Sequence, residues 1–117
     1  MAIEPINFVV FLMGPTASGK TELAIEISKH INSKLISVDS ALIYRGMDIG
    51  TAKPSKKILA AHPHELVDIC EPEDSFSVTE FISLAKKHIK SALAEGKLPI
   101  LVGGTSFYFN ALEHGLS

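Results

Sequence analysis

The chain has 117 residues, of which 46% are hydrophobic, and a formal net charge of −2, so its charge does not by itself indicate a nucleic-acid-binding protein. This length accommodates at most one domain, and the apolar content favours a buried, mostly parallel sheet over a disordered chain. A single cysteine excludes an intrachain disulfide. The longest apolar run is too short to span a bilayer and the N-terminus lacks basic residues, so we expect a cytoplasmic protein without a membrane partner.

The first predicted strand, residues 7–13, leads directly into a complete phosphate-binding pattern, G-x-x-x-x-G-K-[ST]. An amphipathic helix is predicted to follow over 20–31, with Leu23, Ala24, Ile27 and Ile31 on its apolar face. In this strand–loop–helix setting, backbone N–H groups turn inward on an anion at the positive end of the helix dipole. The charge of Lys20 would assist catalysis, and the Thr21 hydroxyl could hold Mg²⁺. The residues predicted to bind phosphate are Gly14, Pro15, Thr16, Ala17, Ser18, Gly19, Lys20 and Thr21.

A second strand, predicted over 34–38, ends at Asp39 and Ser40. A carboxylate at the end of a strand that faces a phosphate site can act as a general base or ligate magnesium. Alternatively, Asp39 could have only a structural role as the N-cap of a helix. Ser40 could be an N-cap or a substrate contact. The following segment, 41–55, has little periodicity and contains Arg45, which could contact an anion.

The clearest predicted helix begins at Ser77, where Ser77 and Glu80 form a capping box, and ends before Gly96. Before it, an extended piece is predicted over 65–70. We assign a structural role to His62 and His64, which precede that piece, because no carboxylate or cysteine completes a metal-binding set with them.

A last strand, predicted over 99–102, runs into Gly103-Gly104-Thr105 and the start of a helix. The two glycines permit close approach of the backbone to a ligand, and Thr105 could also cap that helix. The element order predicts an α/β fold, a P-loop NTPase-like doubly wound parallel sheet whose ligand crevice lies at the carboxyl ends of the strands. Since such a domain normally has about five strands and more than about 150 residues, we expect residues 1–117 to be the N-terminal part of a larger domain, inactive on its own.

The run from Ser37 to Pro54 closely resembles the tRNA dimethylallyltransferase family, also called tRNA isopentenyltransferase. Two further stretches agree with it, residues 62–78 and residues 101–116, so that the resemblance covers essentially the whole chain. It implies transfer of a dimethylallyl group from dimethylallyl diphosphate to N6 of adenosine 37 in the tRNA anticodon loop. The main alternative for the phosphate loop is a small-molecule or nucleotide kinase that uses ATP, with Asp39 activating a hydroxyl. A third possibility is an inactive chain whose loop only binds phosphate.

The resemblance also implies a role for each site residue. The phosphate loop would hold the prenyl donor with Mg²⁺, and Asp39 would accept the N6 proton of the adenine. The residues that would touch the tRNA are Asp39, Ser40, Ala41, Leu42 and Thr105. Leu42 departs from the glutamine that many members of the family have there. We expect the full-length protein to be a monomer.

Overall fold

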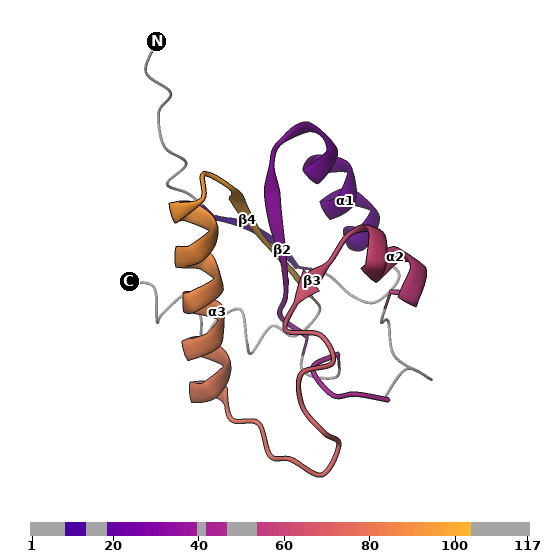
Figure 1. Ribbon diagram of the computed structural model, residues 1–117, viewed down its shortest axis with the longest axis vertical. Helices are drawn as coiled ribbons and strands as arrows, with labels where there is room; N and C mark the ends of the chain where they lie inside the picture. Colours follow the sequence, from indigo (N-terminus) through magenta and orange to yellow (C-terminus); the bar gives the residue numbers. More distant parts are fainter. Residues whose placement is uncertain (1–8, 14–18, 40–41, 47–53, 104–117) are drawn as a thin grey trace.

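A four-stranded sheet forms the centre of this computed structural model, which describes residues 9–13, 19–39, 42–46 and 54–103 (Figure 1). Its strands are β1 (Val10–Met13), β2 (Ser33–Ser37), β3 (His64–Glu65) and β4 (Leu98–Gly103). They lie in the order β1-β4-β2-β3, and the three strand pairings are all parallel. The predicted parallel α/β sheet is therefore confirmed.

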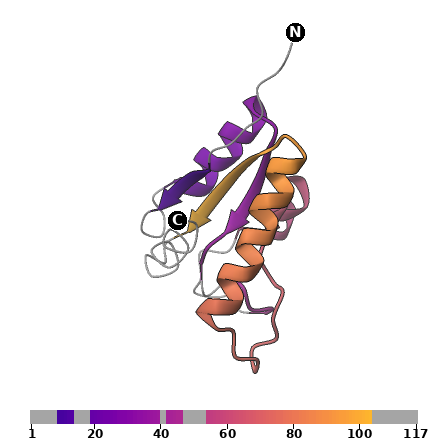
Figure 2. The ribbon, with the colours of Figure 1, turned by 90° about the vertical axis from the view of Figure 1, so that its left-hand side faces the viewer.

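The central strand β4 is buried along its whole length, as expected for a strand covered on both faces. It pairs with β1 on one side and β2 on the other, so that Ile100 lies opposite both Val10 and Leu35. Figure 2 shows the arrowheads of β1, β2 and β4 at the same edge of the sheet. The sequence predicts the ligand crevice at this edge, where the carboxyl ends of the strands meet.

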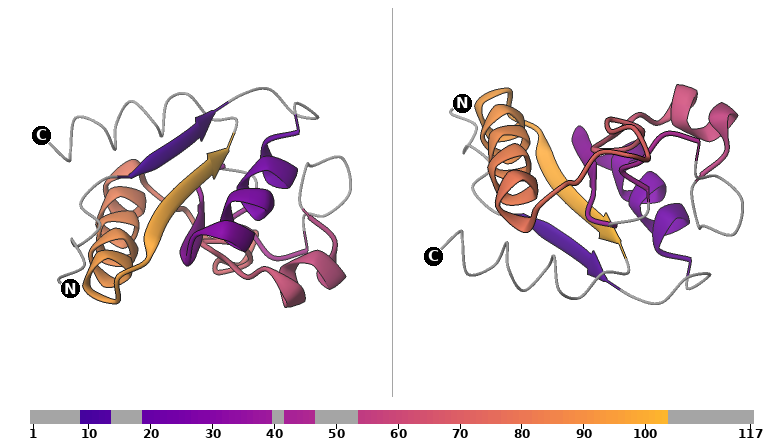
Figure 3. Two further views of the ribbon diagram at one scale, coloured as in Figure 1. Left: turned by 90° about the horizontal axis from the view of Figure 1, so that it is seen from above. Right: turned by 90° about the horizontal axis from the view of Figure 1, so that it is seen from below.

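Helices cover both faces of the sheet (Figure 3), which confirms the doubly wound arrangement. Helix α3 (Val78–Ala94) packs on one face with Ile36 and Leu101, and α1 (Lys20–His30) packs on the other with Leu35 and Ile100. Neighbouring residues of a strand thus contact opposite helices, as the two-residue period of a strand requires. Within the described part of the chain, no helix is long and apolar enough to cross a membrane.

Helix α3 begins where its sequence predicts. The Ser77 side chain accepts a hydrogen bond from the backbone N–H of Glu80 at 3.1 Å. The helix buries one face, and the chain leaves it through Gly96, whose φ of 72° suits a glycine. The buried residues of this face are Phe81, Ala85, Ile89 and Ala92.

Two predictions about local structure are wrong in detail. Of the predicted apolar face of α1, Ala24 is buried and Ile27 is partly buried against the sheet, as expected, but Leu23 and Ile31 are exposed, and Ile25 packs on the sheet as well. A short helix, α2 (Lys56–Ala61), follows the segment 41–55; no element is predicted there, because six residues are too few to display a helical repeat. Of the extended piece predicted over 65–70, only Glu65 belongs to a strand, as the last residue of β3, and only Cys70 forms an isolated bridge, with Tyr44.

Candidate functional site

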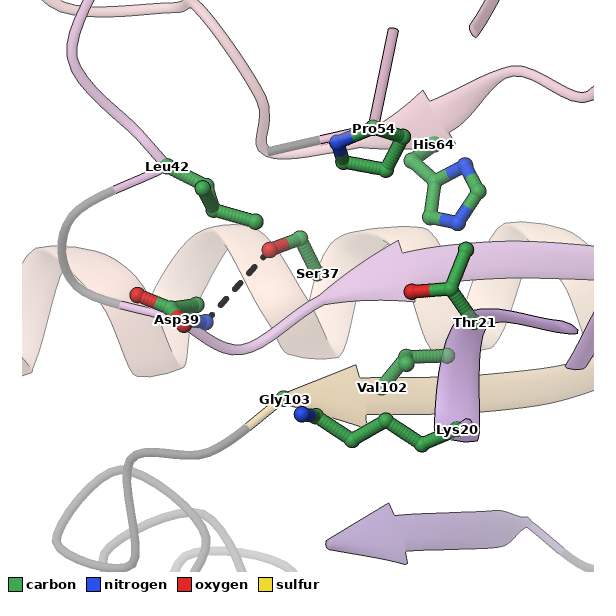
Figure 4. A pocket seen from close by; sticks show the side chains of 9 residues that line it. All are labelled: Lys20, Thr21, Ser37, Asp39, Leu42, Pro54, His64, Val102 and Gly103. Atoms are coloured by element: carbon green, nitrogen blue, oxygen red, sulfur yellow. Dashed lines mark hydrogen bonds between the residues drawn. The ribbon is translucent and has the colours of Figure 1, made fainter. Parts of the chain in front are cut away.

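The carboxyl edge of the sheet carries a narrow pocket of about 30 Å³ (Figure 4). Its side chains come from α1, from the ends of β2 and β4, from the segments after β2, and from β3. The lining residues are Lys20, Thr21, Ser37, Asp39, Leu42, Pro54, His64, Val102 and Gly103. The structure therefore brings together three parts that are far apart in sequence: the last residues of the phosphate loop (Lys20 and Thr21), Asp39 at the end of β2, and Gly103 at the end of β4.

The N-terminus of α1 forms the cationic side of this pocket. Gly19 precedes the helix with a φ of 80°, a left-handed conformation that glycine adopts without strain, and it offers no side chain to cap the helix. Lys20 and Thr21 are the first two helical residues and both line the pocket. A positive helix end with a lysine and a hydroxyl in its first turn is suited to holding an anion.

Asp39 lines the same pocket from the end of β2. The backbone N–H of Val38 donates to the carbonyl of Val102 at 2.9 Å, which extends the β2–β4 pairing past the end of the strand. The Asp39 N–H then donates to the Ser37 hydroxyl at 3.4 Å. These bonds define the backbone that leads into Asp39, which lines the pocket at the end of β2.

Leu42 contributes an apolar wall to the pocket. Its side chain is only 8% exposed, and Figure 4 shows it pointing inward above Ser37. Its carbonyl accepts a hydrogen bond from the N–H of Asp68 at 3.0 Å, and Ile43 accepts another from Ile69 at 2.9 Å, which ties this turn to the segment after β3. A leucine has no amide group, so this position cannot make the side-chain hydrogen bonds that a glutamine could make.

His64 also lies in the pocket, although the sequence indicated a structural role for it. His64 is the first residue of β3 and pairs with Leu35 in the middle of β2, and its side chain lines the pocket. Burial lowers the pKa of its imidazole below the ordinary value of 6.5, and the hydrogen bond to His62 opposes that shift. The signal that could have located His64 is the pairing of β3 beside β2, which no local sequence pattern predicts.

Arg45 does not line the described pocket, and its side chain instead joins two segments of the fold. Its Nε donates to the carbonyl of Asp68 at 2.9 Å, and its Nη1 pairs with the Glu71 carboxylate. These contacts hold the turn after Leu42 against the segment after β3, so they do not support the predicted anion contact.

Cys70, which also follows β3, is a free thiol that is partly buried, and burial together with nearby carboxylates raises its pKa.

The donor set fits a magnesium ion that is shared with a phosphorylated ligand. Thr21 supplies a hydroxyl to the pocket, and magnesium is commonly held by few protein oxygens together with phosphate oxygens and water. Within the described residues, no group of three or more His, Cys, Asp or Glu side chains could form a metal site made of protein alone. The other predicted contacts, at Gly14, Pro15, Thr16, Ala17, Ser18, Ser40, Ala41 and Thr105, lie outside the described residues.

Comparison with known proteins identifies the family. The sequence model of the family described as IPP transferase matches residues 42–117. The chain belongs to the IPP transferase family. This assignment agrees with the resemblance found in the sequence, and it covers the Leu42 turn, α2, β3, α3 and β4.

Two curated relatives of this IPP transferase chain are named tRNA dimethylallyltransferase. The protein from Vesicomyosocius okutanii subsp. Calyptogena okutanii (strain HA) is 63% identical over 100% of the chain, and the one from Ruthia magnifica subsp. Calyptogena magnifica is 62% identical. The crystal structure of the full-length tRNA isopentenylpyrophosphate transferase from Bacillus halodurans matches 92% of the chain and 35% of its own length, with a TM-score of 0.85 and 47% identity. The chain spans 38% of the length of both curated relatives.

Proposed function

We propose that the protein that contains this chain transfers a dimethylallyl group from dimethylallyl diphosphate to N6 of adenosine 37 in a tRNA anticodon loop. The observation that carries the proposal is the common pocket of Lys20, Thr21 and Asp39. A helix N-terminus with a lysine and a hydroxyl, which suits an anion, and a carboxylate thus line one space. Family membership supports the same reaction, because the relatives named above are tRNA dimethylallyltransferases or a tRNA isopentenylpyrophosphate transferase.

In the proposed reaction, the C1–O bond of the donor breaks and diphosphate leaves with the electron pair, while a bond forms between C1 and N6. The charge of Lys20 and the positive end of α1 stabilise the negative charge that develops on the diphosphate. Magnesium bound at Thr21 would add Lewis-acid stabilisation of that charge. The phosphate loop is thus a site for the leaving group.

Asp39 serves the other half of the reaction. The exocyclic amino group of adenine is a weak nucleophile and must lose one proton when the new bond forms. Asp39 accepts that proton as a general base, a role that contributes about 10²–10⁴-fold in other enzymes. The acceptor base must be unstacked to enter such a pocket, which favours a single-stranded anticodon loop over a duplex.

The test uses the full-length polypeptide, labelled dimethylallyl diphosphate with magnesium, and unmodified tRNA. The proposal predicts label in N6-dimethylallyladenosine and release of diphosphate. A parallel reaction with labelled ATP and small metabolites tests the kinase alternative, which uses the same loop for a γ-phosphate. Phosphorylation of a metabolite without prenylated adenosine would overturn the proposal.

A further inference from the structure

His64 presents an unused hydrogen-bond acceptor beside the phosphate-binding helix. Its Nδ1 lies 2.8 Å from the carbonyl oxygen of His62. Because a carbonyl only accepts hydrogen bonds, Nδ1 must carry the proton, and the neutral ring then has a bare lone pair on Nε2. Among the described residues, Nε2 is buried and has no hydrogen-bond partner.

The surrounding backbone holds the ring in this orientation. The carbonyl of His62 is the first one after α2, and the His62 N–H donates to the carbonyl of Ile58 at 2.7 Å. Pro63 restrains the backbone between the two histidines, and pairing with Leu35 fixes His64 on the sheet. The tautomer of His64 is therefore set by a helix end and by a strand.

The side chain that faces this lone pair is Thr21. Both residues line the same pocket, and Figure 4 shows the imidazole of His64 directed toward the Thr21 side chain, with the Thr21 methyl group toward the ring and its hydroxyl oxygen pointing aside. A rotation about the Cα–Cβ bond of Thr21, to another staggered rotamer, would bring the hydroxyl to the place of the methyl group. A hydroxyl can donate only one hydrogen bond, while its oxygen retains two lone pairs. If the Thr21 oxygen is used to ligate a cation, its proton needs a separate acceptor.

We propose that His64 is a positioning residue that accepts the hydroxyl proton of Thr21 through Nε2 and so turns the Thr21 oxygen toward the cation and diphosphate. The bond satisfies a buried acceptor and fixes the hydroxyl in one orientation, as outer partners do for metal ligands in other proteins. The inference deepens the proposed function, since the diphosphate that it positions is the proposed leaving group.

The test is a double-mutant cycle on magnesium-dependent binding of inorganic diphosphate to the full chain, measured by calorimetry. His64→Phe keeps a ring without the acceptor and is expected to weaken binding about tenfold, whereas His64→Gln, which keeps an acceptor oxygen, is expected to recover most of the loss. Thr21→Val is also expected to weaken binding, and adding His64→Phe to it is expected to cost nothing further. Thermal unfolding midpoints of all variants measure any structural loss separately.

Three results would overturn the inference: wild-type affinity in His64→Phe, equal losses in His64→Phe and His64→Gln, or additive losses in the double variant. Absence of magnesium-dependent diphosphate binding by the unsubstituted chain would overturn it as well. The cycle does not depend on prenyl transfer. Failure of the transfer assay with an intact His64–Thr21 coupling would therefore reject the proposed function and retain the inference.

Discussion

Gly103 lies against the backbone of Val38 so closely that no side chain fits between them. A Cβ at Gly103 would stand 2.8 Å from both the carbonyl carbon and the carbonyl oxygen of Val38, and 2.9 Å from its Cγ2. Carbon atoms pack at about 3.5–4.0 Å. Val38 immediately precedes Asp39, so this contact joins the glycine-rich exit of β4 to the position of the carboxylate.

Gly103→Ala is therefore expected to lower both stability and transfer. The added methyl group must push Val38 away from a fully buried strand, and overpacking of this kind typically costs about 1–3 kcal/mol. Because Asp39 moves with Val38, we expect the transfer rate of the full-length protein to fall by more than the folded fraction does. Denaturant unfolding and the prenyl-transfer assay measure the two effects.

Gly96→Ala is the control for this substitution. It has a φ of 72° but open space around its missing Cβ, so the expected cost is the conformational strain alone, about 1 kcal/mol. Gly96 follows α3, far from the carboxyl edge, and its variant should keep normal transfer when folded. Equal losses of transfer in the two variants would contradict a specific role for the Gly103–Val38 contact.

Ser77→Ala is expected to destabilise the fold without affecting the pocket. Its hydroxyl accepts the Glu80 N–H at 3.1 Å at the start of the helix that covers one face of the sheet. Loss of such an N-cap costs about 1 kcal/mol. Urea unfolding of Ser77→Ala measures this loss of unfolding free energy, and Ser75→Ala, at an exposed position, serves as the control. If the unfolding free energies of the two variants differ by less than a few tenths of a kcal/mol, the cap does not contribute to stability.

Stability is expected to decrease as the pH falls below about 6.5. Burial lowers the pKa of both His64 and His88 from 6.5, and in His88 it outweighs the opposing carboxylate of Glu65. The unfolded chain then binds more protons than the folded chain, so the stabilisation is complete above pH 6.5 and is lost as the pH passes down through the lowered pKa values.

Equilibrium unfolding between pH 7.5 and pH 5 measures this dependence. His88→Gln should show a shallower decrease than the unsubstituted chain, because one of the two titrating groups has been removed. His30→Gln is the control, since the exposed His30 pairs with Glu26 on the surface. An increase in stability on acidification over this range would show that the direction of the shifts is wrong.

The sequence predicted those features that depend on local chemistry or on a repeated pattern. The start of α3 followed from its capping box and its buried face from seventeen residues with a helical period. The parallel order followed from the alternation of strands and helices, and it brought Asp39 and Lys20 to one edge. Leu23 was assigned to the wrong face because α1 carries apolar residues on more than one side.

The place of His64 could not be predicted, because it depends on long-range pairing. β3 has two residues, too few for a strand pattern, and lies at the edge of the sheet only because it pairs with β2. The turn after it includes Leu66 with a φ of 66° and Asp68 with a φ of 57°, conformations that tertiary contacts impose on residues that rarely adopt them. No local signal distinguished His64 from a structural histidine.

The central claim, that one pocket holds a leaving group beside Lys20 and a proton acceptor at Asp39, is tested most directly by paired substitutions. In the full-length protein, Asp39→Asn should reduce transfer to tRNA by about 10²–10⁴-fold and leave diphosphate affinity nearly unchanged. Lys20→Met should weaken diphosphate binding itself. If Asp39→Asn keeps normal transfer, or loses diphosphate affinity as severely as Lys20→Met, the assignment of proton acceptance to Asp39 is contradicted.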